Sequence, residues 1–317
     1  CVASLGSDTG GSVRNPASFC STVGYKPTYG LISRYGLISY ANSIEQIGPF
    51  TRTVKDTAFM LNKIAGLDPN DNTTVDNKNE DYLSGIESGI EGKKIGIIKE
   101  MIGEGIDPAV LSATKDAIAK LEGLGATCEE ISLDMVKYSV AAYYTITATE
   151  AGSNLARYDN LRYGYDFPLE GYEFNSYISK ARRKFGPEVT RRMIIGGFVP
   201  SAGHSGKYFL KALKVKSKLT KEVNDAFKKF DFLISPTVPI LPFKLGEKID
   251  DPVSLFLVDI NTVTANLTGK PAISIPFANS NGLPIGIQLM ADSMHDKLLL
   301  QAAYALEQTA SLPEVPI

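Results

Sequence analysis

The sequence of 317 residues has only two histidines, His204 and His295, and they stand far apart in the chain. A Ser-His-Asp hydrolase needs a histidine as the general base beside its serine. Zinc sites in proteins commonly combine histidine and cysteine ligands. The scarcity of histidine therefore argues against both kinds of site, and we expect no metal in this chain.

Cysteine is also scarce, with Cys1, Cys20 and Cys128 as the three examples. So few thiols, odd in number, do not form a disulfide framework and indicate a reducing compartment. We expect Cys20 and Cys128 to be buried as small apolar side chains. The sequence has no run of eighteen apolar residues, which argues against a transmembrane helix.

Charge of one sign is not in excess, since the net charge is −2. A basic face for nucleic acid is therefore not expected, and any RNA is expected to be held mainly by another subunit. A phosphate-binding loop is missing too, because Gly11 stands where that motif requires lysine before Ser12.

The most informative segment that is present is Gly6-Ser-Asp-Thr-Gly-Gly-Ser12. Glycine lets the backbone turn sharply and approach a ligand closely. Successive N–H groups in such a turn can converge on one oxygen, and a serine at its end can attack the carbonyl that they polarise. The α/β-hydrolase motif Gly-x-Ser-x-Gly does not fit, because Arg14 occupies the place of its last glycine. The alternative is a plain Gly/Ser turn without chemistry.

The middle of the chain predicts a strand, a helix and a second strand. Residues 95–98 are apolar, Asp107 precedes Pro108 as a helix N-cap would, and residues 127–133 follow a glycine-containing stop. Such a unit pairs its two strands in parallel.

Residues 134–230 are predicted to be mainly helical. Strands are predicted at 231–235, 271–277 and 284–290, and helices at 262–267 and 295–309. We interpret residues 70–92 as a polar surface excursion, and the repeated Tyr-Gly-Leu-Ile-Ser at 29–33 and 35–39 as turn-and-strand segments. Strands interleaved with helices favour an α/β fold with a mixed sheet covered on both faces. No linker is evident, so we expect one domain.

Five segments together resemble the amidase signature family, and within it the glutaminase subunits of tRNA-dependent amidotransferases. They are Gly6–Ser12, Lys26–Gly30, Gln46–Arg52, Phe185–Met193 and Asp259–Ser274. The resemblance covers essentially the whole chain. It implies an α/β fold with a mixed β-sheet sandwiched between helices, lacking its N-terminal part, and a single amidase signature domain over 1–317, its C-terminal portion.

The resemblance assigns a role to each candidate site residue. Ser12 is the acyl-enzyme nucleophile, and the N–H groups of Thr9, Gly10 and Gly11 form the oxyanion hole. For the substrate, Arg192 binds the α-carboxylate, Asp259 binds the α-ammonium and Tyr143 lines the pocket. Plainer alternatives are a solvated Arg192 that exchanges roles with Arg191, a helix-capping Asp259 and a Tyr143 that only packs in the core.

The same family uses a Ser–Ser–Lys triad, whose bridging serine and lysine precede the nucleophile. Eleven residues precede Ser12; they contain no lysine, and Ser4 and Ser7 do not match the bridging position. We therefore expect that the sequence begins inside its catalytic domain, as Cys1 in place of methionine also suggests. We expect no amidase activity from this chain alone, because Ser12 lacks a base.

The function implied is release of ammonia from glutamine for conversion of Glu-tRNA(Gln), or Asp-tRNA(Asn), by a complex with amidotransferase subunits B and C. ATP and magnesium belong to the partner subunit, which also holds most of the tRNA, and this chain carries no cofactor. A cytoplasmic location is expected, with an organelle as the alternative. Two rival functions are a stand-alone amidase of small neutral or aromatic amides and a catalytically dead scaffold subunit.

Overall fold

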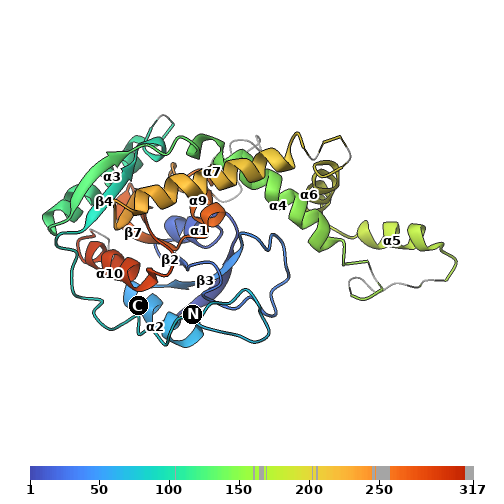
Figure 1. Cartoon of the computed structure of the whole chain (residues 1–317), viewed down its shortest axis with the longest axis horizontal. Helices are drawn as coiled ribbons and strands as arrows, with labels where there is room; N and C mark the ends of the chain where they lie inside the picture. Colours follow the sequence, from blue (N-terminus) through green and yellow to red (C-terminus); the bar gives the residue numbers. More distant parts are fainter. Residues whose placement is uncertain are drawn as a thin grey trace. The chain divides into compact units, whose positions relative to one another are not determined.

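The computed structural model describes residues 1–103, 105–159, 161–163, 168, 170–201, 203, 204, 206–244, 247 and 258–310 (Figure 1). Its contacts divide the chain into two compact units. The first comprises Cys1–Gly36, Ile44–Val140 and Ser217–Ile317, and the second comprises Leu37–Ser43 and Ala141–Lys216. The single domain over 1–317 stays a prediction, because compactness alone does not show whether either unit folds by itself.

One mixed sheet forms the centre of the first unit and contains the eight strands of the described residues. They are β1 (Ser4–Asp8), β2 (Val23–Lys26), β3 (Gln46–Thr51), β4 (Lys94–Ile98), β5 (Thr127–Ile131), β6 (Phe232–Pro236), β7 (Ala272–Ser280) and β8 (Leu283–Ala291). Their order in the sheet is β1-β3-β2-β7-β8-β6-β4-β5. Strand β4 pairs in parallel with β5 and β6, and the other neighbours are antiparallel. The predicted α/β class with a mixed sheet is confirmed.

The helices of the described residues surround this sheet or build the second unit. They are α1 (Arg14–Phe19), α2 (Val54–Ile64), α3 (Pro108–Gly123), α4 (Ser139–Leu155), α5 (Phe174–Arg182), α6 (Pro187–Phe198), α7 (Phe209–Phe227), α9 (Val263–Thr268) and α10 (Asp296–Glu307), with 3-10 turns at Lys99–Met101 and Val136–Tyr138. The division between the units falls inside α4 and α7. Among the described residues, no helix is both long enough and apolar enough to cross a membrane.

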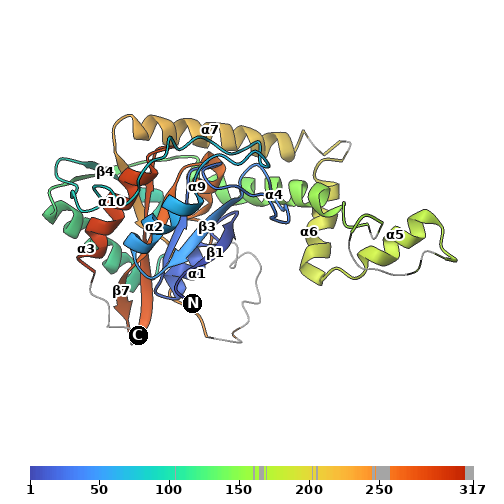
Figure 2. The ribbon, with the colours of Figure 1, turned by 90° about the horizontal axis from the view of Figure 1, so that it is seen from below.

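The two faces of the sheet differ, because side chains alternate along a strand. On β7, Ile273 and Ile275 belong to the main core, which α2, α3 and α10 cover (Figure 2). Ser274 points to the opposite face, where α1 packs on β2, β7 and β8. A Cβ at Gly24 of β2 would lie 2.5 Å from Cβ of Ala17 in α1, so this helix rests almost on the strand backbone. Helix α1 and the loop before it therefore lie on the face of the sheet that carries small and polar side chains.

Most of the predicted elements are confirmed, with ends shifted by a few residues. Strands β4 and β5 pair in parallel around α3. The Asp107 carboxylate accepts a hydrogen bond from Ala109 N at 2.8 Å, and Pro108 is the first helical residue. The predicted strands at 231–235, 271–277 and 284–290 correspond to β6, β7 and β8, and α9 and α10 lie where helices were expected.

Three expectations are wrong in part. Residues 70–92 are not only a surface excursion, because Tyr82, Ile86 and Ile90 anchor the segment in the main core. Residues 29–39 form turns and one isolated bridge rather than strands. Cys20 is exposed because it caps the free end of α1, whereas Cys128 is half-buried against the core.

A pH effect on stability is expected where α10 ends against the start of α2. The Glu307 carboxylate accepts a hydrogen bond from Val54 N at 2.9 Å. Burial raises the pKa of Glu307 to about 7, and Asp56 adds to this while Lys55 opposes it. A raised carboxyl pKa gives stability that is fully present below about pH 4.5 and is lost as the pH rises through 7.

Glu307→Gln keeps an acceptor for Val54 N and removes this titration. We expect the free energy of unfolding of the variant, measured with urea between pH 5 and 8, to fall less with pH than that of wild type. The difference should be on the order of 2 kcal/mol after allowance for partial exposure. Parallel pH profiles of the two proteins would contradict the expectation.

Candidate active site

Ser12 lies on a tight loop that joins β1 to α1. The strand ends at Asp8 and the helix begins at Arg14, so five residues make the turn. Gly11 has φ +136°, and a Cβ there would lie 2.3 Å from Oγ1 of Thr262. Only glycine fits this position. The Ser12 residue itself is exposed, whereas Gly11 before it is buried.

The Asp8 carboxylate fixes the shape of this loop. It accepts hydrogen bonds from the backbone N–H groups of Gly11 at 2.9 Å, Val13 at 3.2 Å and Arg14 at 3.3 Å. Burial by itself would raise the pKa of Asp8, but the charge and hydrogen bonds of Arg14, with a further bond from Asn266, lower the pKa to about 2. Asp8 is therefore an ionised, fully buried anchor.

Arg14 is the matching buried cation, with none of its side chain exposed. Its guanidinium donates to the Asp8 carboxylate at 2.9 and 3.1 Å. It also donates to Thr262 O at 2.9 Å, to Oε1 of Gln288 at 2.7 Å and to Oδ1 of Asn266 at 2.6 Å. One side chain thus joins the Ser12 loop to α9 and β8. A buried guanidinium whose N–H groups are all hydrogen-bonded keeps these elements in one fixed arrangement.

Helix α9 contributes further bonds to the loop. Thr262 Oγ1 donates to Gly10 O at 2.6 Å, and Nδ2 of Asn266 donates to Asp8 O at 2.9 Å. Sequence reasoning had not assigned Thr262, Asn266 or Gln288 to the site. Thr262 and Asn266 lie in the segment Asp259–Ser274 that carries the family resemblance, but the sequence gives no reason to pair them with Asp8.

Asp259 reaches the loop through Asn15, whose Nδ2 donates to Oδ1 of Asp259 at 2.7 Å. Asn15 follows Ser12 by one helical turn, so the structure brings Asp259 to the nucleophile loop. Asp259 is not the N-cap residue of α9, because Thr262 holds that position without a side-chain cap bond.

The three predicted oxyanion-hole residues differ in their hydrogen bonding. The Gly11 N–H group donates to Asp8, so in this conformation it is already engaged. Asp8 does not bind the N–H groups of Thr9 and Gly10, which makes these two the stronger candidates. The oxyanion hole itself stays a prediction.

Arg192 lies in the second unit, on α6, beside the similar Arg191. Both donate to the Glu188 carboxylate, Arg191 at 2.7 Å and Arg192 at 2.6 Å. Hydrogen bonds from Arg191 and then Arg192 lower the pKa of Glu188 to about 2, against the effect of burial. Arg192 also donates to the Tyr40 hydroxyl and lies over that ring. The Arg192 side chain is 30% exposed against 43% for Arg191, so it is the more enclosed of the two.

Tyr143 also belongs to the second unit, on α4, and is only 5% exposed. Its ring contacts that of Tyr144 edge-on, with the centroids 4.8 Å apart. This is the packing expected of a core tyrosine, so its role in lining a substrate pocket stays a prediction.

The sequence did not single out one further buried side chain, that of a lysine in β2. Lys26 is 1% exposed and its Nζ donates to Pro27 O at 2.7 Å. Burial, helped by the Arg14 charge, lowers the pKa of Lys26 to about 7, while Asp8 and Asp296 oppose the change. The next residues tie the end of β2 to α10, because Thr28 N and Oγ1 donate to the Asp296 carboxylate at 2.9 and 2.5 Å.

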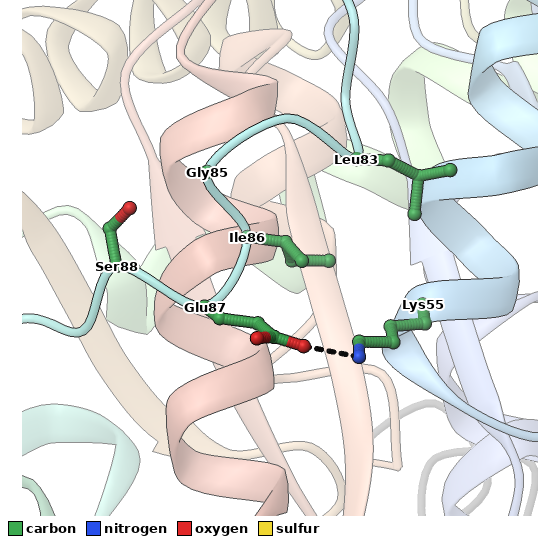
Figure 3. Close-up of a pocket in the computed structure, with 6 residues that line it drawn as sticks. All are labelled: Lys55, Leu83, Gly85, Ile86, Glu87 and Ser88. Atoms are coloured by element: carbon green, nitrogen blue, oxygen red, sulfur yellow. Dashed lines mark hydrogen bonds and ion pairs between the residues drawn. The ribbon is translucent and has the colours of Figure 1, made fainter.

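One hollow of the first unit lacks convergent chemistry. This hollow, shown in Figure 3, has a volume of about 570 Å³ and is lined by Lys55, Leu83, Gly85, Ile86, Glu87 and Ser88. Its two charged side chains, Lys55 and Glu87, are ion-paired with each other across the opening. No group of three or more His, Cys, Asp or Glu side chains in the described part of the chain could hold a metal. The Ser12 loop is therefore the candidate active site.

Comparison with known families identifies the class of protein to which this fold and the Gly-Gly-Ser loop belong. The family model described as Amidase matches residues 1–300. The chain belongs to the amidase family, and its sheet and helices form the amidase signature fold that the sequence predicted.

Comparison with individual proteins shows which members of the family the chain is similar to. The chain is 68% identical over 316 residues to the A subunit of glutamyl-tRNA(Gln) amidotransferase from Cenarchaeum symbiosum and 50% identical over 305 residues to that from Methanosarcina mazei. These alignments cover 100% and 96% of this chain, but 66% and 63% of the relatives. The crystal structure of the A subunit from Thermotoga maritima matches with a TM-score of 0.82 at 44% identity, covering 99% of this chain and 63% of that one. The chain thus spans about two thirds of the length of its relatives.

Proposed function

We propose that this chain is the nucleophile-bearing part of a glutaminase subunit in a tRNA-dependent amidotransferase. The observation that carries the proposal is the 68% identity to an amidotransferase A subunit over the whole chain, together with the intact Ser12 loop. The full protein would release ammonia from glutamine for conversion of Glu-tRNA(Gln) to Gln-tRNA(Gln).

In the proposed reaction, Ser12 Oγ attacks the side-chain amide carbon of glutamine. Its proton passes through the family's bridging serine and lysine to the departing nitrogen, and ammonia leaves. Water then hydrolyses the glutamyl ester, which gives glutamate and restores the serine hydroxyl. The N–H groups of Thr9 and Gly10, with Gly11 if its bond to Asp8 opens, stabilise the negative oxygen.

Recognition of glutamine requires an anion for its α-ammonium and a cation for its α-carboxylate. Asp259 is the proposed anion, because the hydrogen bond from Asn15 holds it at the Ser12 loop. Arg192 supplies the second, since a guanidinium can grip a carboxylate with two bonds. By the family resemblance, Tyr143 is proposed as a further substrate contact.

The family resemblance also implies the partners. We propose subunits B and C, with ATP, magnesium and most of the tRNA contacts in the partner subunit. This chain itself would carry no cofactor. The complex would be cytoplasmic, or organellar in a eukaryote.

The test compares two ligands on the complete protein. Asp259→Asn and Arg192→Lys should each raise KM for glutamine by roughly tenfold to a hundredfold, the value of one hydrogen bond to a charged group. Hydrolysis of propionamide, which has neither α-group, should change less than threefold. Arg191→Lys is the matched control, because it also contacts Glu188 and should leave KM unchanged.

Three outcomes would change this proposal. Unaltered KM for glutamine in Asp259→Asn and Arg192→Lys would point to a stand-alone amidase of neutral or aromatic amides. A larger effect at Arg191 than at Arg192 would exchange their roles. If the complete wild-type protein turned over no amide, the scaffold function would be favoured.

A further inference from the structure

Asn15 occupies a position between the nucleophile loop and the proposed ammonium site. Its side chain is buried, with 8% of the residue exposed. Its Nδ2 would lie 2.7 Å from a Cβ on Gly11, so the amide packs directly against the loop backbone next to Ser12. The same Nδ2 donates to Asp259 at 2.7 Å.

The other end of this amide is unusual. Oδ1 of Asn15 is buried and accepts no hydrogen bond from any described residue. Exchange of the amide oxygen and nitrogen would not solve this, because it would turn an oxygen toward the Asp259 carboxylate. Buried polar atoms are nearly always paired, so an orphan acceptor beside a reactive serine calls for a donor other than the described residues, such as a bound substrate.

An α-ammonium group is a donor of the right chemistry. It carries three N–H bonds, and a carboxylate such as Asp259 uses only part of them. The two atoms of one planar amide lie close together, so a cation bound to Asp259 comes within reach of Oδ1 of Asn15. The neutral amide adds a second acceptor without adding a second negative charge.

We infer that Asn15 is a substrate-binding residue, whose Oδ1 accepts a hydrogen bond from the α-ammonium of an amino-acid amide while its Nδ2 holds Asp259. This rests on the proposed function, because it takes glutamine as the substrate. It adds a specificity residue on the nucleophile loop itself and explains the orphan acceptor.

The test uses Asn15→Leu, which keeps the volume and removes both hydrogen-bonding atoms, in the complete protein. Two ligands are compared: glutamine, through KM, and 4-carbamoylbutanoate, the same molecule without its amino group, through its inhibition constant. We expect KM for glutamine to rise on the order of tenfold to a hundredfold and the inhibition constant of 4-carbamoylbutanoate to change less than twofold. Asn62→Leu is the matched control, because Asn62 makes the same kind of bond to Asp81 on the exposed surface.

Each result has a separate meaning. Equally weakened binding of both ligands, or an unchanged KM for glutamine, would overturn the role of Asn15 in binding. Asn15→Asp keeps an acceptor but repels Asp259, so it should also weaken glutamine selectively; if it restored wild-type KM, the bond from Nδ2 to Asp259 would be irrelevant. A wild-type protein that releases no ammonia from glutamine would instead overturn the proposed function, and this inference with it.

Discussion

Ser12→Ala is expected to abolish amide hydrolysis by the complete protein, with kcat falling by roughly 10⁴-fold or more. Removal of a serine nucleophile has effects on this scale, because no other group can form the acyl-enzyme. The fold should not change, since Ser12 is exposed at the end of its loop. The measurements are ammonia release from glutamine and the melting temperature of each protein.

Ser7→Ala is the matched control for this experiment. Ser7 is also exposed, and it lies on β1 close to the same loop. The control should keep wild-type activity. If Ser12→Ala kept turnover near that of the control, Ser12 would not be the nucleophile.

Arg14→Met is expected to destabilise the fold by about 3–5 kcal/mol, the cost of leaving a buried partner charge uncompensated. Asp8 would stay fully buried without the cation that favours its ionised form, and Asn266 and Gln288 would each lose a donor. Urea unfolding at pH 7 measures the effect. Activity should fall with it, since Asp8 fixes the Ser12 loop.

Lys228→Met provides the comparison for a surface ion pair. Its partner is Asp225, and the two side chains are 74% and 49% exposed. This change should cost less than about 1 kcal/mol. The double variant Asp8→Asn/Arg14→Met should be more stable than Arg14→Met, because it no longer buries a lone charge. Equal destabilisation by Arg14→Met and Lys228→Met would show that the buried pair adds no stability.

Local sequence signals predicted the part of the fold that depends on short-range patterns. Asp107 and Pro108 mark the start of α3 because a cap and a fixed φ act within one turn. The burial of Tyr82 and Ile90 was not predictable in this way. Their segment is polar on average, and its burial depends on a core built from distant strands.

Prediction of the candidate site from the sequence has the same limit. Ser12 and Asp259 could be proposed from motifs that resemble a family. Asn15, Thr262 and Gln288 could not, because each acts through a partner far away in the chain. Hydrogen bonds between such residues leave no periodic trace in the sequence.

The bond from Asn266 to Asp8 spans 258 positions of the chain. During synthesis from the N-terminus, Asp8 and Arg14 emerge long before α9 and β8, their neighbours in the folded protein. Strand β2 likewise waits for β7, with which it pairs. Long-range contacts of this kind are made late, since loop closure must precede them. A nascent chain therefore carries no organised nucleophile until β8 has left the ribosome, and the serine acquires its working geometry only at that late stage of synthesis.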